Sequence, residues 1–285
     1  MGQRTAKFHP AGDEPIVDAI ADAAPRVRTF PEAIAVRRLT KRYGAGANAV
    51  LALSEIDFTV GDREFLAVVG PSGCGKSTLL RILAGLLPAT EGEAFLKGTP
   101  IAGPRKDIGV VFQSPVLFPW RTVLQNALLP SDVQGLNHND MVQTALDLLK
   151  LVGLTGFENR YPRELSGGMQ QRVALVRALV HDPSLLLMDE PFGALDAMTR
   201  ESMNVELQRI WLERRKTALF ITHSTSEAVF LADRVLVMSP RPGRINDIVA
   251  VDLPRPRALD IMNTEIFGVY VRRIRAALNA GGGLD

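Results

Sequence analysis

Short apolar runs alternate with helical periods over most of the chain, and this alternation predicts an α/β fold. Residues 65–69 are five consecutive apolar residues, a pattern typical of a strand buried on both faces. A glycine-rich turn and a helical pattern from Lys76 to Leu87 follow this strand. Because strands separated by helices favour a mainly parallel sheet, we expect one here. Further strands are expected at 34–36, 49–60, 108–112, 185–188, 218–221, 235–238 and 248–251.

The middle of the chain has a different pattern. Between Trp120 and Val180 the periods are helical, including 141–152 and 170–180, and no convincing strand signal interrupts them. We therefore expect a helical insertion within the α/β fold. Additional helices are expected at 197–214, 226–232 and about 264–278.

The composition changes this picture little, but it excludes several classes of protein. The chain has 285 residues, of which 46% are apolar and 22% charged, as in ordinary globular proteins. Lysine plus arginine exceed aspartate plus glutamate by only 33 to 31, so nucleic-acid partners are disfavoured. No apolar run approaches the ~18 residues needed to cross a bilayer. The single cysteine, Cys74, suits a reducing compartment, so we expect a soluble, cytoplasmic chain.

Residues 70–77 match the pattern G-x-x-x-x-G-K-[ST] between a predicted strand and a predicted helix. Glycines let backbone N–H groups surround triphosphate oxygens, and the helix N-terminus adds a favourable dipole. We expect Lys76 to reach the β- and γ-phosphates and Ser77 to offer its hydroxyl to Mg²⁺. The alternative is a glycine-rich structural turn. The candidate nucleotide-binding residues here are Gly70, Pro71, Ser72, Gly73, Cys74, Gly75, Lys76, Ser77 and Thr78.

Two acidic residues follow the apolar run 185–188. The carboxyl end of such a strand in a parallel sheet lies beside the phosphate loop. Asp189 is therefore expected to hold Mg²⁺, usually through water, and Glu190 to polarise the attacking water. The alternative is a solvated pair of acids at a strand end.

Residues 165–170, Leu-Ser-Gly-Gly-Met-Gln, resemble the signature of ATP-binding cassette (ABC) ATPases. The resemblance covers roughly residues 34–250, with all motifs in the family's order. It implies a P-loop NTPase core with a mainly parallel sheet, an N-terminal antiparallel β-subdomain and an inserted α-helical subdomain. The corresponding division is a flexible extension at 1–32, an ATPase domain at 33–250 with its helical insertion at about 119–175, and a helical tail at 251–285.

The resemblance also implies roles for single residues. Tyr43 matches the aromatic residue that stacks on adenine, and His223 matches the histidine that contacts the γ-phosphate. Gln113 matches the glutamine that touches Mg²⁺ or the lytic water. The implied catalytic residues are Glu190, His223, Gln113 and Lys76, and the implied metal-binding residues are Ser77, Gln113 and Asp189.

Other matched positions imply a dimer. Ser166, Gly167 and Gly168 would bind the γ-phosphate of a nucleotide held by a second copy, and residues 194–196 resemble the loop that crosses the dimer interface. Many family members have aspartate after the switch histidine, whereas this chain has Ser224. We expect little loss of hydrolysis from this departure, because the aspartate is not assigned the γ-phosphate contact.

Four segments resemble the nitrate/sulfonate/taurine branch of importer ATPases: 117–123, 227–235, 239–245 and 253–257. This resemblance implies a homodimer that binds ATP and Mg²⁺ at the cytoplasmic face of the cell membrane. It further implies permease subunits docked near Gln113–Gln125, and indirectly a solute-binding protein outside the cytoplasm. The apolar cluster at 117–120 favours a partner surface there, and the alternative is packing under the helical insertion.

Two other classes of protein remain as alternatives. One is a soluble ABC ATPase that acts in translation or DNA repair, although such proteins usually carry two cassettes, a long coiled coil or a zinc hook. The other is a P-loop kinase or GTPase, which would leave the Ser-Gly-Gly run at 166–168 and Gln113 unexplained. The transported solute does not follow from the sequence.

Overall fold

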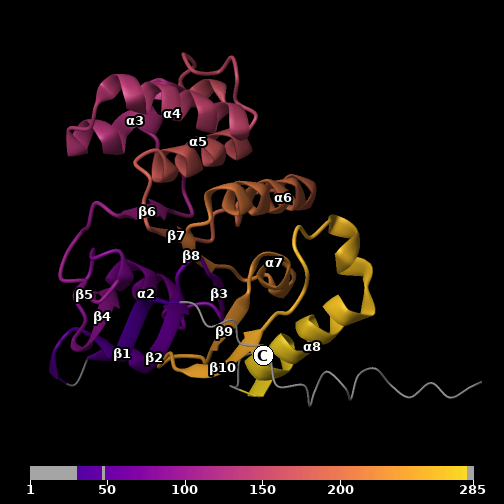
Figure 1. The fold of residues 1–285 in the computed structure, drawn as a ribbon. Coiled ribbons are helices and arrows are strands. Elements are labelled where there is room, and N and C mark those ends of the chain that lie inside the picture. Colours follow the sequence, from indigo (N-terminus) through magenta and orange to yellow (C-terminus); the bar gives the residue numbers. More distant parts are fainter. Residues whose placement is uncertain (1–30, 47–48, 281–285) are drawn as a thin grey trace, which may run out of the picture.

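The computed structural model describes residues 31–46 and 49–280, which form two β-sheets and a set of covering helices (Figure 1). The antiparallel sheet has the strand order β2-β1-β4-β5, and the larger sheet has the order β10-β9-β3-β8-β7-β6. The strands are β1 (Glu32–Tyr43), β2 (Val50–Gly61), β3 (Phe65–Val69), β4 (Glu91–Leu96), β5 (Thr99–Pro100), β6 (Ile108–Val111), β7 (Leu185–Asp189), β8 (Thr217–Ile221), β9 (Arg234–Met238) and β10 (Ile245–Ala250). The helices are α2 (Lys76–Leu83), α3 (Val123–Gln134), α4 (His138–Leu151), α5 (Gly167–Leu179), α6 (Ala197–Arg214), α7 (Thr225–Leu231) and α8 (Glu265–Ala280).

The larger sheet is parallel except at one edge. Strand β3 pairs in parallel with β8 and β9, and β7 pairs in parallel with β8 and β6. Only β10, at the edge, runs antiparallel to its neighbour β9. The predicted mainly parallel sheet is confirmed. Because these strands share one direction, the loops that follow β3, β6, β7 and β8 leave the sheet at the same edge.

Both faces of the larger sheet are buried, and alternate residues of β3 show how. Leu66 and Val68 belong to a core that also contains the buried face of α2 and the inner face of the antiparallel sheet. Phe65, Ala67 and Val69 belong to a second core, under the helices of the opposite face. Burial on both faces explains why this strand is apolar at every position.

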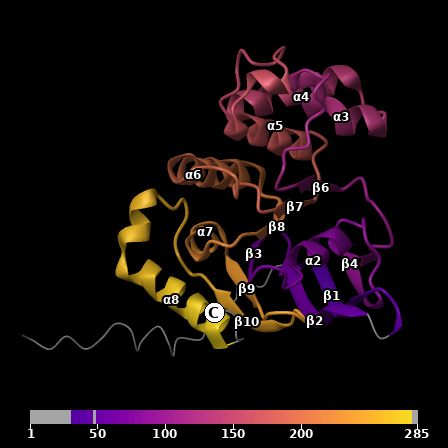
Figure 2. The ribbon, with the colours of Figure 1, turned by 180° about the vertical axis from the view of Figure 1, so that it is seen from behind.

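The helical insertion is a separate group of elements at one end of the molecule. Helices α3, α4 and α5 lie together beyond β6, on the far side from the antiparallel sheet, in both views (Figures 1 and 2). Helix α3 begins at a capping box in which the side chains of Thr122 and Gln125 each bond the backbone N–H of the other residue. The insertion is connected to the sheet through the loops that follow β6 and precede β7.

The structure differs from the sequence prediction most clearly at β4 and β5 and at the end of α2, and the bounds of several other elements differ by a few residues. Strands β4 and β5 were not predicted, because half of β4 is exposed and that half carries glutamates rather than an apolar alternation. Helix α2 ends at Leu83 rather than at Leu87, since Gly85 adopts φ +71° and terminates the helix. A side chain could not replace Gly85, because its Cβ would lie 2.0 Å from the carbonyl oxygen of Gly103.

The predicted N-terminal extension at residues 1–32 lies almost entirely outside the described residues. Glu32, its last residue, already belongs to β1. The division of the chain at 250 stays a prediction. Within the described part, no helix combines the length and the apolar character needed to span a bilayer.

Candidate nucleotide-binding site

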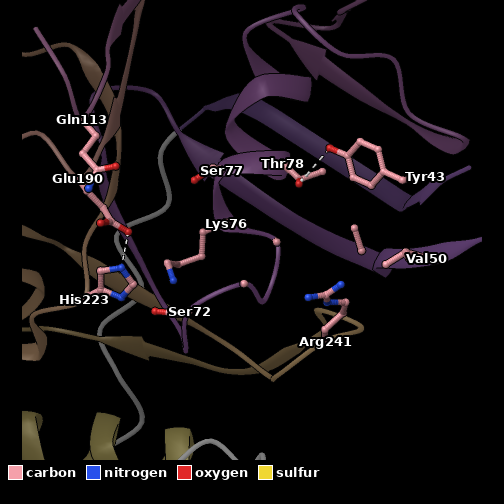
Figure 3. A pocket seen from close by; sticks show the side chains of 13 residues that line it. Tyr43, Val50, Ser72, Lys76, Ser77, Thr78, Gln113, Glu190, His223 and Arg241 are labelled. Atoms are coloured by element: carbon pink, nitrogen blue, oxygen red, sulfur yellow. Dashed lines mark hydrogen bonds and ion pairs between the residues drawn. The ribbon is translucent and has the colours of Figure 1, made fainter.

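A cavity of about 480 Å³ opens at the carboxyl edge of the larger sheet, between that sheet and the antiparallel sheet (Figure 3). Its size is within the usual range for small-ligand sites. Most of the residues predicted to bind or hydrolyse a nucleotide line it, although they come from five separate parts of the chain. The lining residues are Tyr43, Val50, Ala52, Ser72, Gly73, Gly75, Lys76, Ser77, Thr78, Gln113, Glu190, His223 and Arg241.

The phosphate loop forms the floor of the cavity between β3 and α2. Gly73 and Gly75 adopt φ +74° and +111°, which residues with a side chain rarely adopt. A Cβ on Gly75 would also lie 2.6 Å from Leu53 Cδ2. Lys76, only 5% exposed, donates to the carbonyl oxygens of Gly70 and Pro71 at 2.7 and 3.0 Å. The loop therefore holds a buried cation at the start of a helix, an arrangement suited to anionic phosphates.

Ser77 and Asp189 join the phosphate loop to the end of β7. The Ser77 hydroxyl donates to Asp189 Oδ1 at 3.1 Å. Burial raises the pKa of the Asp189 carboxyl, and the hydrogen bond from Ser77 offsets this only in part. A partly buried carboxylate next to a hydroxyl is a set of hard oxygen donors, which is what Mg²⁺ prefers.

Glu190 and His223 form a pair at the opposite side of the cavity from Tyr43 (Figure 3). Glu190 directly follows β7 and His223 follows β8, and these strands are neighbours in the sheet. His223 Nε2 lies 2.5 Å from Glu190 Oε1. Glu190 has a left-handed backbone at φ +47°, which is strained for a residue with a side chain and directs the carboxylate toward the cavity. The pair can hold an attacking water and the phosphate that it attacks.

Gln113 reaches the cavity from the loop after β6, where Gln171 of α5 fixes its backbone. The buried Gln171 amide donates to the carbonyl oxygen of Gln113 at 3.1 Å and also to that of Pro191. One side chain of the helical insertion thus bonds both the loop that carries Gln113 and the loop that follows Glu190. The sequence analysis missed Gln171, although it lies next to the signature.

Tyr43 and Val50 lie at the other end of the cavity, on β1 and β2. The Tyr43 hydroxyl and Thr78 Oγ1 are hydrogen-bonded at 3.2 Å, which ties the aromatic ring to the helix that carries Lys76 (Figure 3). The ring is 39% exposed, so a base can stack on it. The cavity therefore has an aromatic end and an acid–histidine end, with the phosphate loop between them.

Some predicted residues lie outside this cavity. Its lining does not include Gly70, Pro71, Cys74 or Asp189, and Cys74 is fully buried. The signature residues Ser166, Gly167 and Gly168 are also absent from its lining. Ser166 caps α5 by accepting a hydrogen bond from the backbone N–H of Met169 at 3.3 Å. The cavity of one chain therefore lacks the signature.

The structure also brings in cavity residues that the sequence analysis did not assign to the site. Val50 and Ala52 lie on β2, and their only signal is the alternation of a strand. Arg241 lies in the segment 239–245, which sequence resemblance singled out without giving any residue a role. Ser224, which directly follows His223, caps α7 by accepting from the backbone N–H of Glu227 at 3.2 Å.

The fold and the site together define a class of protein. A phosphate loop between a parallel strand, β3, and a helix, with a strand that ends in acidic residues, β7, separated from β3 by the single strand β8, is the arrangement of a P-loop nucleoside triphosphatase. Comparison with known proteins narrows this class. Residues 53–193 match the family model described as ABC transporter.

Similar proteins are numerous and cover most of the chain. This chain is 53% identical over 222 residues to the ABC transporter ATP-binding protein MJ0412 of Methanocaldococcus jannaschii. The match covers 78% of this chain and 83% of MJ0412. The chain is 48% identical to the taurine import ATP-binding protein TauB of Burkholderia pseudomallei (75% and 82% covered) and 45% identical to the aliphatic sulfonates import ATP-binding protein SsuB of Bacillus licheniformis (79% and 87% covered).

A solved structure agrees with the sequence comparisons. The dimeric post-hydrolysis state of the ATP-binding cassette MJ0796 bound to ADP and Pi superposes with a TM-score of 0.69 at 32% identity, covering 78% of this chain and all of that chain. The chain belongs to the ABC transporter ATP-binding proteins. It has the ABC ATPase fold, with an antiparallel sheet, a mainly parallel sheet and a helical insert, and it is an ATPase that couples ATP hydrolysis to transport.

Proposed function

We propose that two copies of this chain bind two MgATP between them and drive the import of a small sulfonate-like or taurine-like solute through a separate permease. The relatives named above as import proteins support the direction of transport and the class of solute. They do not support the alternative of a soluble cassette in translation or DNA repair. The permease and an external binding protein would select the solute, because the cassette contacts only nucleotide and permease.

One observation supports the dimer most directly. The cavity contains Lys76, Glu190 and His223, yet the signature residue Ser166 lies outside its lining. Ser166 caps a helix whose first residue, Gly167, is exposed and whose second, Gly168, is partly exposed, so free N–H groups are available to a phosphate from another molecule. A second copy, placed head to tail, would bring this helix end to the γ-phosphate. The dimeric state of MJ0796 is consistent with this arrangement.

Within each site every residue would have a separate role. Lys76 would neutralise the β- and γ-phosphates, Glu190 would polarise the attacking water, and His223 would hold the γ-phosphate and orient Glu190. Gln113 would contact the water from the loop that also meets the helical insertion. Catalysis then consists of positioning and charge stabilisation.

The donor set fits Mg²⁺ bound together with the nucleotide. Ser77 and Asp189 offer oxygen atoms from two elements, and Mg²⁺ commonly takes one or two protein ligands plus substrate phosphates and waters. The described residues contain no cluster of three or more His, Cys, Asp or Glu side chains that could hold a metal without the nucleotide. Bound Mg²⁺ would supply charge neutralisation across the β- and γ-phosphates.

The permease would dock beside Gln113, on the segment that leads into α3. Phe118 and Trp120 stack with their ring centroids 5.1 Å apart, and Trp120 is 70% exposed. Val116, beside them, is 59% exposed. An aromatic pair on a loop, with Trp120 exposed and Phe118 partly buried, fits a partner surface. It lies close in sequence to Gln113, so docking and the nucleotide site would be connected through one short segment.

A mixing experiment tests the shared site. Lys76→Ala and Ser166→Arg each remove one half of both sites in a homodimer, so each variant alone is expected to lose ATPase activity. In a mixed dimer, the intact Lys76 of one chain faces the intact Ser166 of the other, and one site is complete. Recovery of ATP hydrolysis on mixing is expected. No recovery, with both variants folded and exchanging subunits, would contradict the proposal.

A further inference from the structure

Arg241 lines the nucleotide cavity, and no role described above accounts for it. It follows β9 in the loop 239–244 and reaches the cavity from the side opposite Thr78 (Figure 3). Among residues 31–46 and 49–280 it is the only arginine that lines this cavity, whereas Arg244 of the same loop is also exposed but does not line it. Two arginines on the same loop therefore differ in whether they line the cavity.

The loop that carries Arg241 is firmly attached to the phosphate loop and to β2. The Gly243 backbone N–H donates to the Ala52 carbonyl oxygen at 3.0 Å, and the Gly243 carbonyl accepts from Ser54 at 3.0 Å. A Cβ on Gly243 would lie 2.1 Å from the carbonyl oxygen of Cys74, so only glycine permits this close approach. Ser239 Oγ also accepts from the Arg244 backbone N–H at 2.9 Å. The backbone around Arg241 is thus held in place without its side chain.

The guanidinium of Arg241 has unused hydrogen-bonding capacity. It makes no hydrogen bond or ion pair with any of the residues that the structure describes. Its Nη2 lies 3.7 Å from where a Cβ on Gly73 would be, which places the cation over the outer turn of the phosphate loop. Lys76, the other cation of the cavity, is instead bonded to loop carbonyls. An arginine presents five donors, and those of Arg241 are free to meet hydrogen-bond acceptors of a molecule bound in the cavity.

The position of Arg241 indicates which part of the nucleotide it meets. In Figure 3, Glu190 and His223 lie on one side of the phosphate loop, while Arg241 lies on the other side with Tyr43 and Val50. The γ-phosphate belongs at the acid–histidine end, so the nucleoside belongs at the end with Tyr43. The geometry points to Arg241 as a nucleoside-binding residue that donates hydrogen bonds to the ribose and base of bound ATP, an inference that rests on the function proposed above.

Binding measurements on the full chain test this role. Arg241→Met and the matched control Arg244→Met remove the same charge from the same loop, and Arg241→Lys keeps the charge without the planar donors. Titration calorimetry with MgATP, MgADP and inorganic tripolyphosphate separates nucleoside from phosphate contacts. We expect Arg241→Met to weaken MgATP and MgADP binding alike by about tenfold, the scale of one charge-assisted hydrogen bond. Tripolyphosphate binding and the Arg244→Met variant should stay within about twofold of wild type.

Three results would contradict a role for Arg241 in binding the nucleoside of the same chain's nucleotide. Unchanged MgATP affinity in folded Arg241→Met protein would overturn the inference. An equal loss for tripolyphosphate would also overturn it, because Arg241 would then act on the phosphates. A loss seen only in ATP-dependent dimer formation, with normal MgADP binding, would assign Arg241 to the partner chain instead. Failure of the proposed function is distinguished from failure of this inference by Lys76→Ala. If the proposed function is wrong, Lys76→Ala binds nucleotide as tightly as wild type.

Discussion

His223 Nε2 lies 2.5 Å from Glu190 Oε1, and the two residues stand at the ends of the neighbouring parallel strands β8 and β7. Neither residue is near the other in sequence, and the sheet alone brings them together. The strained backbone of Glu190, at φ +47°, turns its carboxylate toward His223. The same edge of the sheet holds Lys76 and the Ser77–Asp189 hydrogen bond, so one small region contains the groups that we propose neutralise the phosphate charge, bind Mg²⁺ and activate water.

Asp189→Asn is expected to raise the Mg²⁺ concentration needed for half-maximal ATPase activity by tenfold or more. Asparagine keeps the size of the side chain and can still accept a hydrogen bond from Ser77, but it loses the charge that attracts the cation. Removing Mg²⁺ with EDTA should abolish hydrolysis by both proteins. A Mg²⁺ dependence identical to that of wild type would exclude Asp189 as part of the metal site.

Asp189→Asn is expected to impair Mg²⁺-dependent activity but to leave the stability of the nucleotide-free protein unchanged or higher. Burial raises the pKa of Asp189, so the folded protein binds its proton at a higher pH than the unfolded chain does. The charged carboxylate therefore costs stability at neutral pH, and this cost disappears as the pH falls through the raised pKa. Without nucleotide, Asp189→Asn should unfold at a temperature equal to or above that of wild type at pH 7. The difference should shrink at lower pH.

Gln171→Leu should lower the catalytic rate more than it lowers ATP affinity. The Gln171 amide bonds the backbone next to both Gln113 and Glu190, so its loss leaves these loops free to shift while the phosphate loop stays intact. Stability should also fall by about 1–3 kcal/mol, because buried carbonyl groups lose a donor. Gln143→Leu, on the exposed side of α4, is the matched control. A change in ATP affinity alone would contradict this role.

Cys74 should react slowly with thiol reagents although it lies within the phosphate loop. It is fully buried, and burial raises the pKa of its thiol, so at pH 8 less thiolate is present in the folded protein than in the unfolded chain. It is the chain's single cysteine, so a colorimetric thiol reagent reports on this site alone. We expect a rate far below that of protein unfolded in urea, rising with pH and falling further with MgATP. Fast modification of the native protein would contradict the burial.

Gly109→Ala should destabilise the larger sheet at its edge strand β6. A Cβ at Gly109 would lie 2.2 Å from the carbonyl oxygen of Ala178, so the strand and α5 would have to separate. We expect a loss of about 1–3 kcal/mol in the free energy of unfolding, measured in urea. Gly103→Ala is the matched control, because nothing lies within 4 Å of its Cβ position.

Much of the fold and the site follows from patterns confined to short segments. The buried strand β3 and helix α6 were predicted with the bounds that the structure shows, because an uninterrupted apolar run and a long helical period are strong local signals. The exposed strand β4 carries no such signal. Arg241 and Gln171 were missed for another reason. Their roles depend on where distant loops meet, namely β2 with residue 243 and α5 with residue 191, and a single sequence does not show such contacts.

The most direct test of the hydrolysis site is a single-turnover measurement on Glu190→Gln. Glutamine preserves the shape of the side chain but cannot take a proton from water, so MgATP should still bind with wild-type affinity. The rate of ATP cleavage should fall by at least about 100-fold. Wild-type cleavage by this variant, with nucleotide binding intact, would contradict the assignment of Glu190 as the residue that activates water.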